Sequence, residues 1–503
     1  MPVELASSTD SGRLSADQYS YRQTAVSSQA PLLYERVARI VESQISSGTL
    51  RANERIPSVR AMSRTAKVSV STVVQAYVHL ENVGLIEARP QSGFYVRAPE
   101  PRRLPEPRPR PARAPRPASI ANEVLDMCRE ALTRTDFVPL NSAVTEPAMY
   151  PTQRLNNLVR EVLRDHPLNA GQCILPPGDE ELRRQIAKRM ALAGAPTDPA
   201  HVVITSGTMD AITLALRVAC KPGDTVLVES PTYFGLLQSI EHLSLKVVEV
   251  PNCSVAGIDV DAVRAIARST RLGAAVLMPN FNNPSGSLTP DDAKREIVQI
   301  LTGHEVPIIE DDIYGDLHYG GTRPTSLRAF DESGLVVSCG SVSKTIAFGY
   351  RIGWAVSPQF HTEIARAKFY SSVACPTLQQ LVLARYYASG GYDRYLRRVR
   401  STLAINSQNH INAIARFFPD GTRVAQPPGG VVLWVELPRN VDAAELFRTA
   451  AASSIGVAPG VVFSAKADYR NYIRLSCGLP WTPTLERAVE KLGRLVAGMA
   501  RNV

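Results

Sequence analysis

The amino-acid sequence predicts a multidomain protein, in which a small helical module with a β-ribbon precedes a larger α/β domain on a mainly parallel central sheet. Three observations support this prediction. The chain has 503 residues, so two or three domains are expected. Residues 32–97 have compact helical periodicity. After about residue 120, short apolar strands alternate with helical stretches, which favours parallel βα units.

Domain boundaries follow changes in composition. Residues 1–30 are rich in Ser, Thr, Asp, Gln and Ala, and are expected to form a disordered tail. Residues 31–97 form the first domain, residues 98–119 a linker that alternates Pro with Arg, and residues 120–503 the second domain. Because proline cannot continue a helix or a central strand, the linker is expected to be an extended, semi-rigid spacer.

The net charge of +9 is concentrated at the start of the chain. Residues 1–120 contain 17 Lys/Arg and 10 Asp/Glu, a balance of +7, whereas the rest contains 39 and 37, a balance of +2. A basic module on a nearly neutral body is typical of an appended nucleic-acid binder. A basic tail that serves solubility would give the same balance.

Other compositional features exclude several classes of protein. No run of eighteen apolar residues occurs, so no transmembrane helix and no membrane partner are expected. The N-terminus lacks the pattern of a secretory signal, and seven dispersed cysteines without a CxxC pair indicate reduced thiols in a cytoplasmic protein. Neither a disulfide framework nor a metal site is expected.

The first domain has the element order of a winged helix-turn-helix. Residues 32–46 keep apolar side chains on one helical face, and Pro57 and Ser58 mark the start of a second helix. The segment STVVQAYVHLENVGLI keeps helical spacing until Gly84, and IEARPQSGFYV reads as two short strands around a turn. A helix beginning near Ser69 would enter the major groove of DNA with its first residues. A small helical bundle that binds protein is the alternative.

The segment PSVRAMSRTAKVSVSTVVQAYVHLENVGLIEARPQSGFYV resembles the DNA-binding domain of GntR-type regulators. The resemblance implies that double-stranded promoter DNA is a partner. Family members often have arginine where this chain has Val70 and Val74, which leaves fewer charged contacts. The residues that the resemblance implies at the DNA are Arg60 on phosphate or base, Ser69, Ser71 and Thr72 at the start of the recognition helix, and Arg89 and Gly93 in the wing.

The second domain contains a lysine whose companions suit a reactive amine, although a solvated lysine at a strand end is the alternative for Lys344 alone. Asp311 leaves an apolar strand in IIEDDIYGDL and can keep a pyridine nitrogen protonated, while Asp312 is expected to be structural. Asn283, in PNFNNPSG, and Tyr314 can bond a phenolic oxygen. These parts suit pyridoxal 5′-phosphate (PLP), held as a Lys344 aldimine and used as an electron sink.

A phosphate site is predicted where the strand of HVVITSGTMDAITLALRVA turns into a helix. Backbone N–H groups at a helix start favour anions, and the Ser206 hydroxyl can add to them. Tyr233, just past a strand end in ESPTYFG, can lie flat against an aromatic ring. The other residues predicted around the cofactor are Gly207, Thr208, Ser341, Ser343 and Arg351.

In order and spacing these motifs resemble a fold type I aminotransferase from about residue 120 to the end. The segments PPGGVVLWVELP, GVAPGVVFS and YIRLSCG also match. The resemblance implies that Arg474 binds the α-carboxylate of an amino-acid-like ligand; a surface ion pair is the alternative. Two departures bear on cofactor retention: Cys173 stands where relatives often have a tyrosine that reaches the partner subunit's phosphate, and Met209 stands where a polar side chain is common.

The first domain, as a DNA reader, is followed by a Pro-rich linker and then by the aminotransferase-like second domain, or body. This order resembles the MocR-type transcription regulators. That resemblance implies a homodimer, usually head-to-tail, whose body senses PLP itself or an amino-acid or amine effector and passes the change to two DNA readers. The alternative is an active PLP-dependent aminotransferase with an appended DNA-binding domain, because sensing and transamination require the same residues. A third class, a scaffold that does not bind DNA, is also open.

Overall fold

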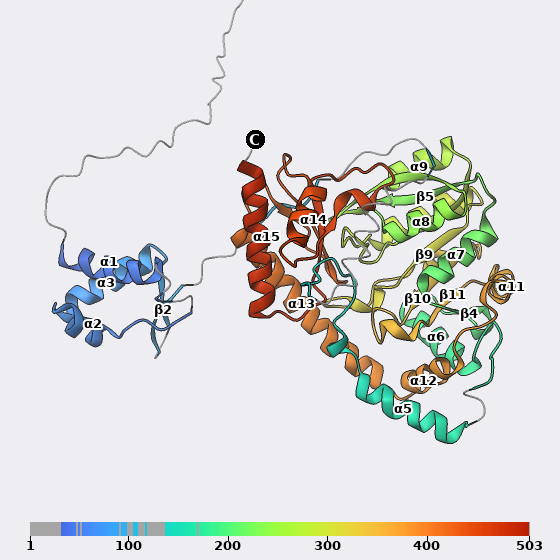
Figure 1. Cartoon of the computed structure of the whole chain (residues 1–503), viewed down its shortest axis with the longest axis horizontal. Coiled ribbons are helices and arrows are strands. Elements are labelled where there is room, and N and C mark those ends of the chain that lie inside the picture. The colour runs from blue at the N-terminus through green and yellow to red at the C-terminus, as the bar shows by residue number, and fades with distance from the viewer. Residues whose placement is uncertain are drawn as a thin grey trace, which may run out of the picture. The chain divides into compact units, whose positions relative to one another are not determined.

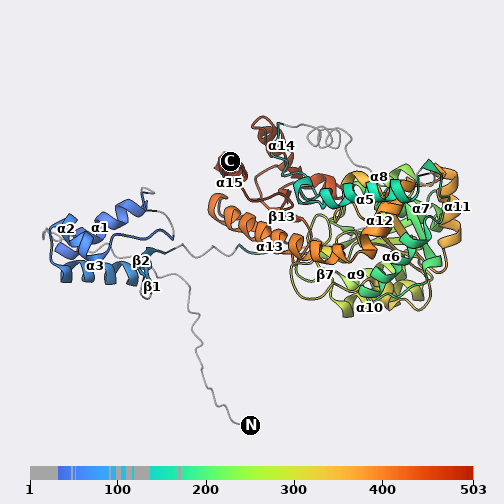
Figure 2. The same cartoon turned by 90° about the horizontal axis from the view of Figure 1, so that it is seen from below.

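The computed structural model describes residues 32–46, 49–50, 53–89, 92–97, 104–108, 136–167 and 171–501, and the backbone of residues 116–117. The chain divides into two units, Met1–Glu100 and Pro101–Val503, each described here by itself (Figures 1 and 2). The tail predicted for residues 1–30 lies outside the described residues.

The first unit is the predicted winged helix-turn-helix. Its elements are α1 (Leu33–Ser46), α2 (Val59–Ala66), α3 (Val70–Asn82), β1 (Ile86–Arg89) and β2 (Gly93–Val96). Serine begins two helices as expected, because Ser58 Oγ accepts from Ala61 N at 3.3 Å and Ser69 Oγ from Thr72 N at 3.1 Å. The three helices close over a core formed by Val37, Val41, Met62, Val73, Ala76, Tyr77 and Leu80.

The β-ribbon follows α3 directly. Gly84, with φ of +76°, allows the chain to leave α3, and β1 then pairs antiparallel with β2. At the first residue of β2, Gly93 has φ of +107° and would place a Cβ 3.3 Å from the Arg55 guanidinium. The left-handed conformation therefore favours glycine there, and a side chain would also require the Arg55 guanidinium to shift slightly.

The second unit contains a large, mostly parallel sheet, which confirms the predicted fold class. The strand order is β3-β6-β5-β8-β9-β10-β11-β4, with β7 on β6; only β11, β3 and β7 run antiparallel to their neighbours. The strands are β3 (Arg116–Pro117), β4 (Val202–Thr205), β5 (Thr225–Ser230), β6 (Lys246–Cys253), β7 (Gly257–Ile258), β8 (Leu272–Leu277), β9 (Ile308–Asp311), β10 (Val336–Ser341) and β11 (Gly353–Val356).

Helices cover both faces of this sheet, because its strands alternate buried side chains between two cores. On β5, Val226 and Val228 pack in the core that contains α7 and α8, while Leu227 packs in the core that contains α9 and α10. In Figure 2, α8 and α10 lie on opposite sides of the body. The helices are α5 (Thr152–Asp165), α6 (Glu180–Leu192), α7 (Thr208–Ala219), α8 (Phe234–His242), α9 (Val260–Ser269), α10 (Asp291–Gly303), α11 (His361–Ser372) and α12 (Thr377–Ala388).

A smaller antiparallel sheet follows in the order β12-β13-β15-β14. The long helix α13 links it to the large sheet, because its first half packs with α5, α6 and α12 and its last turns pack with α15 (Figure 1). These elements are α13 (Gly391–Phe417), β12 (Arg423–Val424), β13 (Val432–Glu436), α14 (Ala443–Ala451), β14 (Ala458–Pro459), β15 (Tyr472–Ser476) and α15 (Pro483–Arg501). Short 3₁₀ turns occur at 147–149, 199–201, 315–317, 327–330, 348–350 and 460–463.

Part of the proline-rich segment is attached to the body rather than acting as a spacer. Leu104 is buried in the core beside the small sheet, and Pro105 O accepts from Val424 N at 3.0 Å. Arg108 N donates to Glu436 Oε2 at 2.9 Å. The segment is extended, as proline requires, but these bonds join residues 104–108 to the second unit.

Candidate cofactor site and DNA-contact surface

A cavity of about 420 Å³ lies at the carboxyl ends of the parallel strands, where ligands bind in open α/β sheets. The residues after β5, β8, β9 and β10 all contribute to it, as does the start of α7. Of the predicted cofactor residues, those that line it are Thr208, Tyr233, Asn283, Asp311, Tyr314, Ser341, Ser343, Lys344 and Arg351, together with Arg474.

Lys344 lines this cavity three residues after the end of β10 and is half-buried. Burial, together with the charges of Arg474 and Arg351, lowers the pKa of its amine to about 7, and the charge of Asp311 opposes this shift. Its Nζ lies 5.3 Å from the centre of the Phe348 ring. Lys344 is thus a neutral nucleophile over much of the physiological pH range, rather than a solvated surface cation.

Asp311, the last residue of β9, faces the same cavity. Burial raises the pKa of its carboxyl to about 7, although its Oδ1 accepts a bond from Ile313 N at 3.2 Å. The charge of Asp312 also raises this pKa, and the charge of Lys344 lowers it. A cation placed in the cavity would therefore stabilise the ionised form of Asp311.

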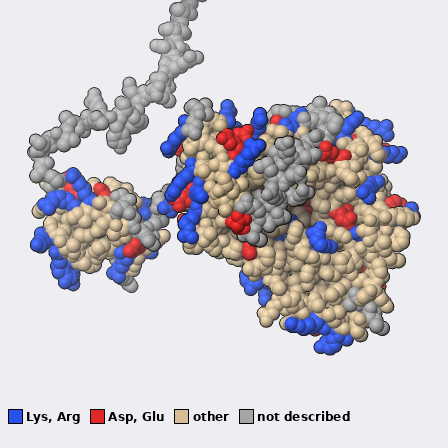
Figure 3. All heavy atoms as spheres, viewed as in Figure 1, with Lys and Arg blue, Asp and Glu red and all other residues tan. Residues whose placement is uncertain are grey.

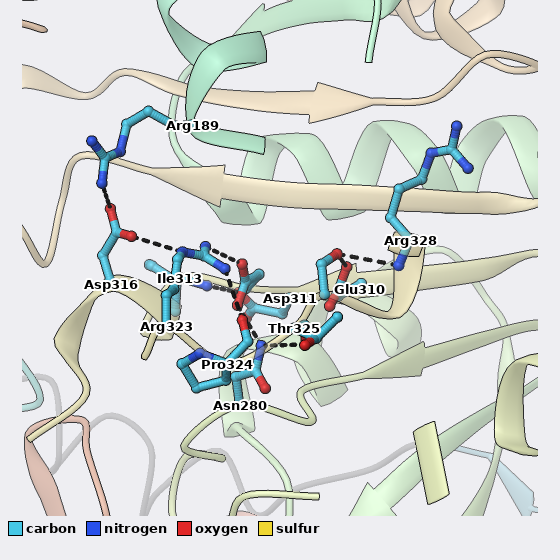
Figure 4. A network of polar contacts seen from close by, with 12 residues as sticks. Arg189, Asn280, Glu310, Asp311, Ile313, Asp316, Arg323, Pro324, Thr325 and Arg328 are labelled. Carbon is cyan, nitrogen blue, oxygen red and sulfur yellow. Dashed lines mark hydrogen bonds and ion pairs between the residues drawn. The ribbon is translucent and has the colours of Figure 1, made fainter. Parts of the chain in front are cut away.

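Asp312 is not among the residues that line the cavity; it pairs with Arg323, which belongs to a network of charges with Asp316 and Arg189 (Figure 4). Its Oδ2 pairs with Arg323 Nη2 at 2.5 Å, and its Oδ1 accepts from Asn280 Nδ2 at 2.9 Å. Arg323 also pairs with Asp316 at 2.8 Å, and Asp316 pairs with Arg189 of α6 at 3.2 Å. Asp312 is accordingly a structural group, because it ties the turn after β9 to Asn280 and Arg323.

The predicted phosphate site lies where β4 turns into α7. Gly207, with φ of +99°, precedes α7, and a Cβ there would lie 2.7 Å from Arg351 Nη2. Arg351 donates to Ser343 Oγ at 3.2 Å and to Ser206 O at 2.9 Å. Thr208 Oγ1 is buried without a hydrogen-bond partner among the described residues, so a hydroxyl is left for an anion.

The Ser206 hydroxyl has another role than the expected one. It accepts from Lys368 Nζ at 2.9 Å, and the same ammonium pairs with Asp210 Oδ2 at 2.7 Å. Asp210 Oδ2 also accepts from Ser206 N at 2.7 Å. Ser206 is not among the residues that line the cavity; its hydroxyl connects the turn to α11 instead. Sequence spacing could not reveal this, because Lys368 lies far along the chain.

Arg474 is buried in the small sheet and reaches the cavity, which excludes the alternative of a surface ion pair. Its Nη1 donates to Asn283 Oδ1 at 3.0 Å, and its Nη2 donates to Asn141 O. Tyr314 donates its hydroxyl to Ala143 O at 3.0 Å. The ring of Tyr233 folds over Gly235, where a Cβ would lie 2.6 Å from Tyr233 Cε1.

Two site residues were missed in the sequence. Glu229 is a buried acid in the apolar strand β5, and burial raises its pKa to about 7. It accepts from Met278 N and from Asn282, and so fixes the loop that carries Asn283. An acid inside an apolar strand is a signal that could have found it. Asn141, whose amide is buried in the cavity wall without a partner among the described residues, had no such signal.

The two departures fall in different places. Met209 lines the cavity, whereas Cys173 is exposed. Within the described ranges, no group of three or more His, Cys, Asp or Glu side chains could hold a metal ion. None of the helices described is both long and apolar enough to cross a membrane.

The residues predicted to contact DNA lie on the surface of the first unit. Arg60 is exposed on α2. Ser69, Ser71 and Thr72 form one cluster, in which Ser69 Oγ lies 2.8 Å from Ser71 Oγ and 2.7 Å from Thr72 Oγ1. Figure 3 shows basic side chains around the rim of this unit, over α2 and near the β-ribbon.

Arg89 of the wing is already engaged. It pairs with Glu87 at 2.7 Å, donates to Asn53 Oδ1 at 3.0 Å, and stacks 4.3 Å above the Tyr95 ring. These contacts brace the ribbon, and the DNA contact that the resemblance implies for Arg89 stays a prediction. Arg55 is exposed, and its guanidinium lies against Gly93 of the wing.

Two family models match the chain, one in each unit. Residues 33–96 match the model described as bacterial regulatory proteins, gntR family, and residues 149–492 match aminotransferase class I and II. A helix-turn-helix reader on an aminotransferase-like body defines the class of the protein. The chain belongs to the GntR-family regulators of the MocR type.

Similar proteins cover nearly the whole chain. The uncharacterized HTH-type transcriptional regulators YdcR and YjiR of Escherichia coli strain K12 are each 35% identical, over 92% of this chain and 98% of their own length. Among solved structures, LysN of Thermus thermophilus, an α-aminoadipate aminotransferase complexed with N-(5′-phosphopyridoxyl)-L-leucine, has a TM-score of 0.70 at 28% identity. The match covers 75% of this chain and 96% of that one.

Proposed function

We propose that this DNA-binding regulator holds PLP through Lys344 and that its body senses PLP or an amino-acid or amine effector. The observation that carries the proposal is the convergence of a neutral lysine, a buried carboxylate and an anion site on one cavity. Side chains of this kind rarely meet in a cavity without a ligand to satisfy them.

The residues present fit the cofactor. Thr208 Oγ1 lacks a partner among the described residues, and Gly207 leaves room for Arg351, so phosphate would be held by Thr208, Arg351 and the N–H groups at the start of α7. Asp311 would hold the pyridinium nitrogen. When bound, PLP supplies an electron sink for an amine substrate.

The remaining groups orient the ligand. Asn283 Oδ1 is occupied by Arg474, which leaves its amide nitrogen to donate to the phenolic oxygen, as the Tyr314 hydroxyl can after leaving Ala143. The Tyr233 ring would cover one face of the pyridine. Arg474 would bind the effector carboxylate, because it is the cation that enters the cavity from the small sheet.

Sensing requires that the effector have different affinities for two states of the body. With PLP bound, Lys344 would be the group that an amine effector displaces, because the cofactor offers one aldehyde carbon to both amines. We further propose a head-to-tail homodimer with its cavities at the subunit interface. Phe348, which lines the cavity and is 49% exposed, is consistent with cover from a partner.

Active transamination is the second candidate. The same neutral lysine that can bind an aldehyde can also move a proton on a bound substrate, and Arg474 would orient that substrate. The attached DNA reader favours regulation over metabolism.

The test measures, by fluorescence anisotropy, how tightly the full chain binds the intergenic DNA upstream of its own gene. The affinity is compared at fixed salt with and without PLP, and then with each of a panel of amino acids. We expect specific binding that shifts with PLP or with one amino compound. Lys344→Ala should keep specific binding and lose the shift together with the visible absorption of lysine-bound PLP.

Other outcomes separate the candidates. Unchanged visible absorption in Lys344→Ala would place the cofactor on another amine. Binding no tighter than to random DNA, with steady turnover of an amino acid and an oxo acid, would favour the enzyme.

A further inference from the structure

The recognition helix α3 presents an apolar surface to solvent. Val70, Val74 and Val78 recur at helical spacing and are 50%, 44% and 46% exposed. The opposite face of α3 supplies Val73, Ala76, Tyr77 and Leu80 to the core. Three exposed valines on one helical face form a continuous apolar surface, which favours contact with something other than water.

Polar and charged groups around this surface favour a polyanion as the occupant. Gln75 is exposed on the same face, between Val74 and Val78. Residues 59–80 contain Arg60, Arg64 and Lys67 and no Asp or Glu. These three cations are exposed beside an apolar strip, a combination that suits DNA phosphates flanking a groove.

The same helix lacks the side chains that read guanine. α3 contains neither Arg nor Lys, the residues that bind guanine O6 and N7 in the major groove. At its start, Ser69 bonds to both Ser71 and Thr72, so these hydroxyls also hold the cap. Gln75 and the valines are what remains to read base edges.

We propose that α3 reads A·T base pairs. Val74 and Val78 pack against thymine 5-methyl groups, and the Gln75 amide pairs with adenine N6 and N7. The proposal rests on the DNA-binding function and names what the reader recognises. Val70, in the first turn, extends the methyl contact by one base step.

The occupant is a DNA major groove rather than a partner protein, for two reasons. The valine strip is continuous with the cap of a helix that belongs to a gntR-type reader. Along α2 and α3 as far as residue 80 the charged side chains are all positive, and Glu81 follows only in the last turn of α3; an apolar protein partner needs no such excess.

The experiment selects binding sites from random duplexes with the full chain, supplied with PLP, and then replaces each thymine of the selected site by uracil. Uracil lacks only the 5-methyl group. We expect A·T pairs at the positions that α3 contacts, and about fourfold weaker binding of wild type for each lost methyl contact.

Variants assign the contacts. Val74→Ala should bind thymine and uracil sites equally at one position, whereas Val83→Ala should keep the wild-type difference because Val83 is exposed after the last turn, off this face. Gln75→Ala should bind the site about tenfold more weakly and accept other pairs opposite the lost adenine. Exposed positions such as these are substituted without loss of the core.

Four results would overturn the proposal, and they are distinguishable. Enrichment of G·C pairs at the contacted positions, or equal affinity of wild type for thymine and uracil sites, would refute A·T reading while leaving the regulator intact. No enrichment of any sequence would refute the DNA-binding function as well. Capture of a protein on the valine strip with unchanged DNA affinity in Val74→Ala would assign the strip to that protein.

Discussion

Lys344 shows how its surroundings decide the chemistry of one side chain. An exposed lysine is protonated at neutral pH and cannot attack an aldehyde. Here burial and the charge of Arg474 bring the pKa of the amine to about 7, and Asp311 limits that shift. The neutral amine is therefore available in the apo protein.

Cofactor uptake should depend on pH as this pKa dictates. Because only the neutral amine reacts, the rate at which apo protein takes up PLP should rise about tenfold per pH unit below pH 7 and level off above it. Stopped-flow absorbance measures the rate. Arg474→Gln should move the inflection to higher pH, since a neighbouring positive charge is lost.

Arg474→Lys is the matched control. It keeps the positive charge, so the inflection of its curve of PLP-uptake rate against pH should stay near that of wild type. If Arg474→Gln and wild type share one pH profile, the charge of Arg474 does not act on Lys344.

At the scale of elements, Lys368 joins α11 to the turn that begins α7. It is fully buried and holds Ser206 Oγ and Asp210 Oδ2. Lys368→Met should lower the free energy of unfolding by about 2 kcal/mol and weaken PLP binding, because the turn that faces the phosphate loses its brace. Denaturant unfolding and a PLP titration measure the two effects.

Lys368→Met combined with Asp210→Asn tests the same contact. The double variant should recover part of the lost stability, because no carboxylate is left beside an apolar side chain. Additive losses would show that the two side chains do not act on each other.

The network around Arg323 connects β9, the following turn and α6. Burial alone would raise the pKa of Asp316, but the charges of Arg323 and Arg189 outweigh it and hold that pKa well below its usual range. A lowered acid pKa contributes stability above the unfolded-state value of about 4, and this contribution is lost as pH falls below that value.

Arg323→Met should therefore cost about 3–5 kcal/mol at neutral pH, since Asp312 and Asp316 lose their shared partner. Unfolding of the variant and of wild type followed from pH 7 to pH 2 should show a difference that is constant above about pH 4 and shrinks below it, as the stabilising contribution of ionised Asp316 is lost. A difference that does not shrink over the acid range would place the loss in packing rather than in charge.

At the scale of the whole molecule, the link between reader and body begins at residues 104–108, which bond to the small sheet. Leu104→Ala should loosen this attachment, because Leu104 is buried in the body's core. We expect unchanged affinity for a selected half-site, unchanged PLP binding, and a reduced effect of PLP on binding to the full operator, all followed by anisotropy.

Leu32→Ala is a control outside the attachment, because Leu32 is exposed in the first unit. A full PLP response in Leu104→Ala would show that signals pass by another route.

The sequence by itself determined the elements and the chemistry of the two domains. Ser58 and Ser69 cap helices, Gly84 ends one, and apolar strands precede polar turns, because these depend on neighbours within a few residues. It also indicated the amine, carboxylate and arginine of the cavity, since their residue types follow strand ends that must share one edge of a parallel sheet.

Only the tertiary structure decided which partners these groups have. Ser206 bonds Lys368 across 162 positions of the chain, Glu229 supports the Asn283 loop, and Arg89 is engaged by Glu87 and Tyr95. Leu104, which the sequence placed in the linker, is buried in the core of the second unit. Hydrogen bonds, burial and pKa shifts depend on distances in space, and local sequence fixes those only where neighbours in the chain are neighbours in the fold.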